Sequence, residues 1–340
     1  MRGMGTVVTF IIPAYNSAAT LRRCLDSFVA PALFPFMEVL VVNDGSGDNT
    51  AAIAREYEAA HPIFRLINKP NGGHGSVINA AVPLAQGTYI KVVDSDDRVQ
   101  TRNLAAYITA LQKARAQVVL THFRTINRRT RHIRAYRMHH LHYGRTYKFA
   151  GLWRHPARVK NVCNFHGITY RTDYYRACNI RLSEGISYED QEYATLPFAH
   201  GPTVMPLDLF LYEYTLGDPN QSVSDTRMVQ NIAQLETVLW KILGHTPRSP
   251  AAKAYFLYKT KEILLSYYMA ALVKNPDKPG GRQLAERMQQ RVRKQDPALT
   301  KSIQRNYMLC LLLSYSGITG STLAAWQKSR VYRLFAGFVH

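Results

Sequence analysis

The chain has 340 residues, of which 46% are hydrophobic and 19% are charged. Its 43 Lys and Arg outnumber the 23 Asp and Glu, so the formal net charge is +20 and the pI is near 9.9. This hydrophobic content excludes a disordered chain, and the absence of about 20 uninterrupted apolar residues argues against a conventional membrane span. We expect one or two globular domains, no signal peptide, and four free thiols in a reducing cytosol.

Strand-like and helix-like segments alternate over the first hundred residues. Apolar, β-branched runs predict strands, and amphipathic runs after them predict helices, the first of which Ser17 is expected to cap. This alternation predicts βαβ units and therefore a mostly parallel sheet with flanking helices. The expected strands are residues 6–12, 38–43, 63–68 and 88–94, and the expected helices are residues 17–28, 49–60 and 76–85.

The rest of the chain divides into a mixed middle and a helical end. Residues 98–172 contain no Asp or Glu, which indicates an anionic partner or, equally, a solvated basic face. Beyond residue 224 the pattern becomes helical. We predict an α/β domain over residues 1–224 and a helical region over residues 225–340. The expected later elements are a helix at 104–114, a strand at 118–123, and helices at 228–243, 251–273, 282–294 and 300–315.

Polar residues follow the predicted strands where a parallel sheet binds its ligands. Asp94 and Asp96 come directly after an apolar strand, and two carboxylates at this spacing can converge on one hard cation. Pro13 ends the first strand, and an exposed Tyr15 beyond it suits the face of a nucleobase. Asp44, after the second strand, can accept a hydrogen bond from a uracil imide N–H. Each motif alone also fits an ordinary turn.

Taken together, these motifs resemble the family 2 glycosyltransferases, which have the GT-A fold. The resemblance is strong over residues 5–100 and weaker to about residue 224. It implies a nucleotide-sugar donor, most simply a UDP-sugar, and Mn²⁺ or Mg²⁺ as cofactor. The metal ligands that it implies are Asp96 and Asp94. The donor-binding residues that it implies are Pro13, Tyr15, Asp44, Asn71, Asp94 and Ser95.

One Gly-rich segment, residues 71–79, departs from the family pattern because the family's Arg is absent. His74 or Lys69 is expected to contact the donor phosphates in its place, and His166 is a further candidate near the phosphates or the acceptor. Gly73 and Gly75 also superficially resemble a dinucleotide-binding fingerprint, although the third glycine and the ribose acid are missing.

The acidic pair Glu189-Asp190 resembles the family's acceptor-side motif. Inversion at an anomeric carbon requires a base that removes the acceptor hydroxyl proton, and a carboxylate suits that task. The resemblance assigns this role to Asp190, with Glu189 orienting it or contacting the acceptor. Acids at a helix start can also simply interact with the helix dipole. Residues 212–224 resemble the family's closing segment over the donor.

The resemblance therefore implies an inverting glycosyltransferase with a surface-glycan or lipid-linked acceptor. We expect a cytoplasmic protein whose basic side and C-terminal end, including residues 307–313 and 330–335, dock on the anionic inner face of the cell membrane. No recognised nucleic-acid-binding module is present, so nucleic acid is not an expected partner. The alternatives are a non-catalytic basic protein that binds anionic polymer or membrane, and a nucleotidyltransferase, which would normally show a Gly-rich loop after the first strand.

Overall fold

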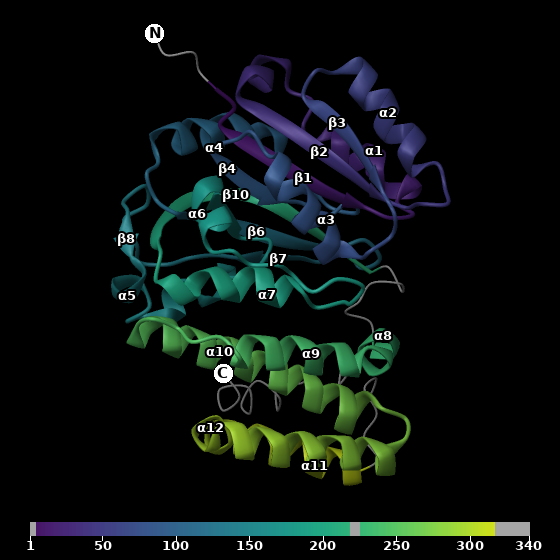
Figure 1. Cartoon of the computed structure of the whole chain (residues 1–340), viewed down its shortest axis with the longest axis vertical. Helices are drawn as coiled ribbons and strands as arrows, with labels where there is room; N and C mark the ends of the chain where they lie inside the picture. Colours follow the sequence, from purple (N-terminus) through teal and green to yellow (C-terminus); the bar gives the residue numbers. More distant parts are fainter. Residues whose placement is uncertain (1–4, 218–224, 317–340) are drawn as a thin grey trace. The chain divides into compact units, whose positions relative to one another are not determined.

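The computed structural model describes residues 5–217 and 225–316 (Figure 1). Internal contacts divide the chain into two units: Met1–Gly217 with His245–Tyr255, and Asp218–Gly244 with Phe256–His340. The predicted boundary at residue 224 stays a prediction, as do the roles of residues 220–224 and 330–335, which lie outside the described residues. Among the described residues no helix is both long and apolar enough to cross a membrane.

The first unit is built on one mixed sheet with the strand order β3-β2-β1-β4-β9-β6-β10-β5. Its first four strands are parallel, β9 runs antiparallel to β4 and β6, and β6 is parallel to β10. The strands are β1 (Val8–Ala14), β2 (Met37–Asp44), β3 (Phe64–Lys69), β4 (Tyr89–Val92), β5 (Arg98–Val99), β6 (Val118–Asn127), β7 (Ile133–Tyr136), β8 (Tyr147–Lys148), β9 (Ile168–Arg171) and β10 (Thr203–Leu216).

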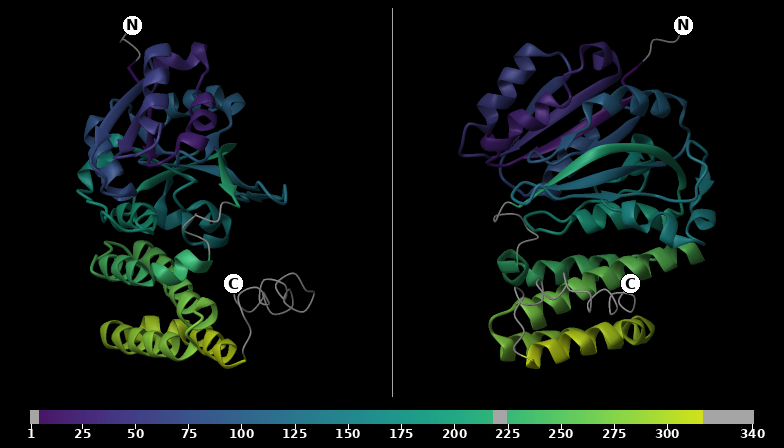
Figure 2. Two further views of the ribbon diagram at one scale, coloured as in Figure 1. Left: turned by 90° about the vertical axis from the view of Figure 1, so that its right-hand side faces the viewer. Right: turned by 180° about the vertical axis from the view of Figure 1, so that it is seen from behind.

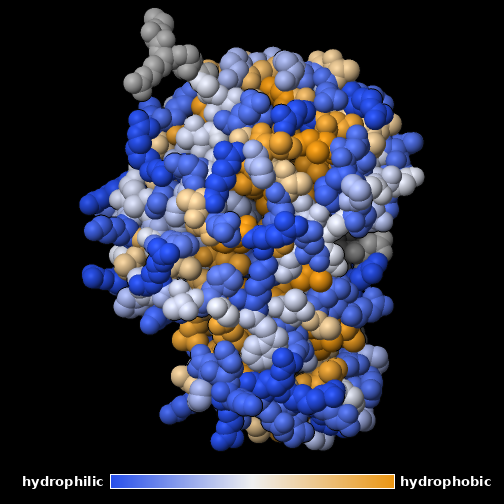
Figure 3. All heavy atoms as spheres, viewed as in Figure 1, coloured by the Kyte–Doolittle hydropathy of each residue, from blue (hydrophilic) through white to orange (hydrophobic). Residues whose placement is uncertain are grey.

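Helices flank this sheet, which confirms the predicted α/β class. They are α1 (Ala18–Asp26), α2 (Thr50–Ala60), α3 (His74–Ala81), α4 (Thr101–Lys113), α5 (Phe149–Leu152), α6 (Thr172–Ala177) and α7 (Asp190–Thr195). All seven residues of β1 are buried, as expected for a central strand covered on both faces. Hydrophilic side chains cover much of the face shown in Figure 3, with hydrophobic ones gathered between them.

Residues 225–316, the described part of the C-terminal region, are mostly helical, as predicted. Its helices are α8 (Asp225–Gln230), α9 (Ile232–Leu243), α10 (Pro250–Tyr268), α11 (Lys278–Gln295) and α12 (Pro297–Tyr315). The predicted helix at 251–273 changes character after Tyr268 and continues as a π-helical turn, Met269–Lys274. At the end of this turn the Lys278 ammonium donates hydrogen bonds to the carbonyl oxygens of Leu272 and Val273.

The predicted cap of the first helix is wrong. Ser17 makes no side-chain cap; its hydroxyl lies 2.7 Å from that of Ser95 instead. Asp48 takes over, because one of its oxygens accepts from the Ala18 N–H at 3.0 Å and the other from the Thr50 N–H at 3.0 Å. One carboxylate therefore serves the first turns of both α1 and α2, and it ties the loops after β1 and β2 together at one edge of the sheet.

Candidate functional site

The loop after β4 is held by a tyrosine from a distant strand. The Tyr212 hydroxyl of β10 accepts from the Asp94 N–H at 3.1 Å and donates to Asp97 Oδ2 at 2.6 Å. The Thr215 N–H donates to the other Asp97 oxygen at 2.6 Å. Burial raises the pKa of Asp97 well above its usual value, and the neighbouring Asp96 and Asp94 add to the shift. Asp97, which the motif did not single out, is therefore a buried anchor of this loop.

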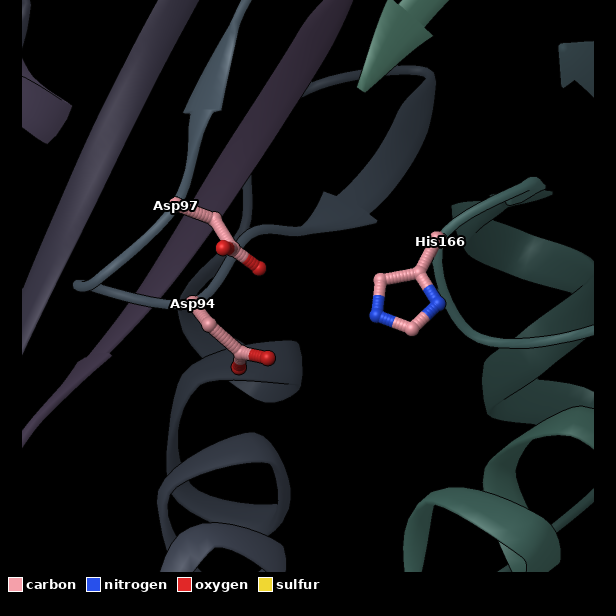
Figure 4. A group of neighbouring side chains, drawn as sticks. All are labelled: Asp94, Asp97 and His166. Atoms are coloured by element: carbon pink, nitrogen blue, oxygen red, sulfur yellow. The ribbon is translucent and has the colours of Figure 1, made fainter. Parts of the chain in front are cut away.

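Asp94, Asp97 and His166 form a group suited to a metal ion. One ligand atom from each of the three lies within 4.8 Å of the others, and both carboxylates point toward the ring of His166 (Figure 4). Burial lowers the pKa of His166 to about 4, so its imidazole is neutral, as a ligand must be. His166 Nδ1 is buried with no hydrogen-bond partner among the described residues. The two carboxylates suit Mn²⁺ or Mg²⁺, and the imidazole favours Mn²⁺ of the two.

The position of His166 depends on a buried lysine. Lys91 of β4 is fully buried, and its ammonium donates to the carbonyl oxygens of His166 at 2.7 Å and Ile168 at 3.0 Å. Burial lowers the pKa of Lys91 to about 7. Asp96 is not a member of the three-residue group, and its main-chain oxygen accepts a hydrogen bond from Arg23. Its assignment as a metal ligand stays a prediction.

His74 joins the two acidic motifs. It is the first residue of α3, and its Nε2 lies 2.9 Å from Asp94 Oδ1 while its Nδ1 lies 2.6 Å from Glu189 Oε1. Burial opposes protonation of His74, but the contacts with Asp94 and Glu189 outweigh it and raise the pKa of the imidazole well above the usual value. The protonated imidazole of His74 thus lies between the loop after β4 and the acidic pair.

The Gly-rich segment is shaped to receive the acidic-pair loop. A Cβ at Gly75 would lie 2.1 Å from the Ser183 carbonyl oxygen and 2.9 Å from Glu189 Cγ. Gly73 has a φ of +81°, and the Gly185 N–H donates to the Gly72 oxygen at 2.7 Å. This close packing of the chain against itself accounts for the glycines, and it removes the support for a dinucleotide-binding fingerprint.

Asp44, at the end of β2, holds the start of the Gly-rich segment through hydrogen bonds and an ion pair. Its carboxylate, almost fully buried, accepts from the backbone N–H groups of Gly72 at 3.0 Å and Gly73 at 2.8 Å. Lys69 Nζ lies 2.6 Å from the same carboxylate, and the Asn71 side chain donates to the Asp44 carbonyl oxygen at 3.0 Å. Lys69 and Asn71 are therefore brought to Asp44.

The remaining predicted donor-side residues lie at the ends of β1 and β4. Pro13 is buried within β1, whereas Tyr15 just beyond it is 54% exposed. Ser95 is buried against Ser17. The ring of Tyr15 is thus open to a ligand, as its prediction requires, and a role for each of these residues toward a donor stays a prediction.

The acidic pair opens α7. Glu189 is 4% exposed, and Asp190 is the first residue of the helix, with the Gln191 side chain donating to it at 3.1 Å. Glu192 is fully buried and accepts from the Ser183 N–H and hydroxyl, so it has a structural role.

Tyr214 shows that the two acidic motifs share one neighbourhood. Burial raises the pKa of its hydroxyl, and four carboxylates close to the ring add to the shift. These are Asp97, Asp94, Asp96 and Asp190. Carboxylates of the loop after β4 and of the acidic pair therefore act electrostatically on the same tyrosine, while His74 contacts one carboxylate of each directly.

Sequence reasoning missed Asp97 and Lys91 as residues that build the site, and it assigned Tyr212 and Tyr214 only to a segment that closes over the donor. Asp97 carried a local signal, as the third carboxylate of the turn after β4. Lys91 lies in an apolar strand, where a charged residue is rarely buried without partners, and this was a signal available in the sequence.

The fold and this convergence of carboxylates at the carboxyl edge of the sheet define a GT-A-like protein. The model of the family "Glycosyl transferase family 2" matches residues 9–181, so the chain belongs to glycosyl transferase family 2. TarS 1-349 of S. aureus, solved in complex with UDP-GlcNAc, matches with a TM-score of 0.62 and 19% identity, covering 92% of this chain and 93% of that one. A mannosyltransferase from Pyrobaculum calidifontis, solved with GDP-Man and Mn²⁺, matches with a TM-score of 0.51 and 16% identity, covering 96% and 88%.

Sequence relatives match over shorter stretches. Chondroitin synthase of Pasteurella multocida (strain Pm70) is 43% identical over 94 residues, which are 28% of this chain and 10% of the synthase. An uncharacterized glycosyltransferase, EpsJ of Bacillus subtilis (strain 168), is 27% identical over 214 residues, which are 61% of this chain and 60% of that protein. The chain thus spans a tenth of the first relative and less than two thirds of the second.

Proposed function

We propose that this protein is an inverting glycosyltransferase that moves a sugar from a UDP-sugar to a surface-glycan or lipid-linked acceptor. The observation that carries the proposal is His74, which contacts Asp94 on the donor side and Glu189 on the acceptor side. Support also comes from the family and from neighbours solved with nucleotide sugars. These findings do not favour a non-catalytic polymer-binding protein.

In the proposed reaction the Asp190 carboxylate takes the proton of the acceptor hydroxyl. The acceptor oxygen then bonds to the anomeric carbon on the face opposite the diphosphate, the bond from that carbon to the phosphate oxygen breaks, and UDP leaves with its electron pair. Glu189, held by His74, fixes the start of α7 and thereby orients Asp190. Tyr15 is proposed to face the uracil, with Asp44, Asn71 and the other predicted donor residues around the nucleotide.

A divalent cation is proposed to bind at the loop after β4. Asp94 and Asp96 are the ligands that the family resemblance implies, and His166 is the further ligand that the geometry favours, beside Asp97. When bound, Mn²⁺ or Mg²⁺ neutralises negative charge on the diphosphate. His74 and Lys69 supply protein cations on the same side of the sheet.

The decisive experiment replaces Asp190 by Asn. We expect this variant to bind UDP with Mn²⁺ as the wild type does but to lose transfer by about 10²–10⁴-fold, because a general base is removed without changing the shape of the side chain. A screen of UDP-sugars for metal-dependent hydrolysis identifies the donor first. A loss of less than tenfold in D190N would move the base to Glu189.

We further propose peripheral attachment to an anionic membrane. The support is an exposed apolar face on α12, where Met308, Leu309, Leu312 and Tyr315 are each at least 43% exposed, together with the basic charge of the chain. Flotation with anionic and neutral liposomes at low salt tests it: flotation with anionic vesicles only is expected, and absence from both fractions would contradict the proposal.

A further inference from the structure

A two-stranded hairpin extends beyond the rest of the sheet unit next to the candidate site (Figure 2). It is formed by the antiparallel strands β6 and β7, in which Phe123 pairs with Tyr136 and Thr125 with Arg134. Since side chains alternate along a strand, these four residues lie on one face of the hairpin. The same face continues into β10, where Tyr212 pairs with Phe123 and Tyr214 with Thr125.

Stacked rings connect this hairpin with the candidate metal group. Tyr136 stacks on Phe123 with centroids 4.4 Å apart and an interplanar angle of 5°. Phe123 stacks on His166 at 5.2 Å, and His166 stacks on Tyr214 at 4.3 Å. At the outer end the Arg134 guanidinium lies 4.9 Å from the centroid of Tyr136. A continuous row of flat groups thus runs from an exposed arginine to the ring that faces Asp94 and Asp97.

The charge of this hairpin is entirely positive. Residues 98–172 hold no Asp or Glu, and six basic side chains between residues 128 and 137 are exposed. None of these arginines forms an ion pair with a residue in the described part of the chain, and Asp208 of β10 contacts His122. The six are Arg128, Arg129, Arg131, His132, Arg134 and Arg137. Unpaired cations at this density attract an anionic partner.

The chemistry of the hairpin favours a glycan over a lipid surface. Only one large apolar side chain of the hairpin, Ile133, is strongly exposed among the described residues, whereas membrane insertion requires several. Tyr136 is half-buried, with Phe123 stacked on its ring and Arg134 over it, so the edge of the ring is what a sugar can contact. Arg134 beside it presents a planar fork of donors that matches a carboxylate or phosphate.

We infer that the Arg134–Tyr136 side of this hairpin is an extended acceptor site for an anionic glycan. This inference rests on the proposed glycosyl transfer and adds the class of acceptor: a chain of sugars that carries carboxylate or phosphate groups. The acidic group pairs with Arg134, and the sugar contacts the edge of Tyr136 beside it. The row of rings aligns the glycan so that its end reaches the acidic pair, because Glu189 is joined through His74 to Asp94, which lies beside His166.

The test measures binding of the full chain to polygalacturonate, with neutral amylose and inorganic polyphosphate as comparison polymers. We expect polygalacturonate to bind more tightly than either, and increasing salt to weaken that binding. Arg134→Ala and Tyr136→Ala are each expected to lower the affinity about fivefold. Arg129→Ala, in the turn of the same hairpin, is the matched control and is expected to change it by less than about twofold. Tyr136→Phe keeps the ring and is expected to keep the affinity, which guards against misfolding of the Ala variant.

Three results would overturn the inference. Equal losses of affinity for polygalacturonate in R129A and R134A would mean that the basic surface attracts the polymer without a defined binding site. Equal affinity for polyphosphate and polygalacturonate would remove the sugar from the recognition. Binding to anionic vesicles that R134A weakens, without binding to polygalacturonate, would assign the hairpin to a membrane. Metal-dependent hydrolysis of UDP-sugars by the wild type is measured separately, so that its absence counts against the proposed function and not against the glycan site.

Discussion

The packing of α3 against the acidic-pair loop makes Gly75 the most informative position to change. In Gly75→Ala the new Cβ would lie 2.1 Å from the Ser183 oxygen and 2.9 Å from Glu189 Cγ. Since real contacts of this kind are not shorter than 3.0 Å, backbone must move by at least 0.9 Å. Overpacking of this degree destabilises by about 1–3 kcal/mol, and a displacement near 1 Å at a catalytic group can lower a rate by about 10²-fold.

We expect G75A to lower both the free energy of unfolding and the rate of metal-dependent donor hydrolysis. Gly151→Ala in α5 is the matched control, because a Cβ at Gly151 has no atom within 4 Å. Alanine favours a helix over glycine, so G151A should be neutral or slightly stabilising, and the same propensity makes a loss in G75A attributable to the clash. Denaturant unfolding and hydrolysis on the same preparations check this. Wild-type stability and rate in G75A would refute the close packing of residues 182–189 on α3.

Two further predictions concern the metal group and the base of the hairpin. Asp96→Ala is expected to abolish Mn²⁺-dependent UDP binding in calorimetry with an unchanged unfolding midpoint; unchanged affinity would remove Asp96 from the ligand set and leave Asp97 as the second carboxylate. Burial lowers the pKa of His122, whose Nδ1 accepts from the Met138 N–H, so the unfolded state binds the proton more readily than the folded state. The free energy of unfolding should therefore fall as the pH drops below about 6.5 toward the folded-state pKa. The measurement is the difference in the free energy of unfolding between wild type and His122→Asn across that pH range. A difference that does not vary with pH would contradict the prediction.

Much of the fold was predictable because its elements are encoded locally. The alternation of apolar strands with amphipathic helices over the first hundred residues predicted the parallel part of the sheet, with element ends within a few residues of those observed. The residues that follow parallel strands lie at the carboxyl edge of the sheet regardless of the loop conformations. The sequence therefore predicted that Tyr15, Asp44 and Asp94 lie at the same edge.

The connections within the site were decided by contacts between segments far apart in the chain. No local pattern specifies that His74 joins Asp94 to Glu189, or that Tyr212 holds the loop after β4. The cap expected at Ser17 failed for the same reason, since Asp48 of the neighbouring loop reaches the N-terminus of α1. Residue propensity predicts the local secondary structure of a segment, and hydrophobic periodicity predicts which of its faces packs against the core. Which buried polar groups satisfy one another depends on three-dimensional packing, and only the tertiary structure decided it.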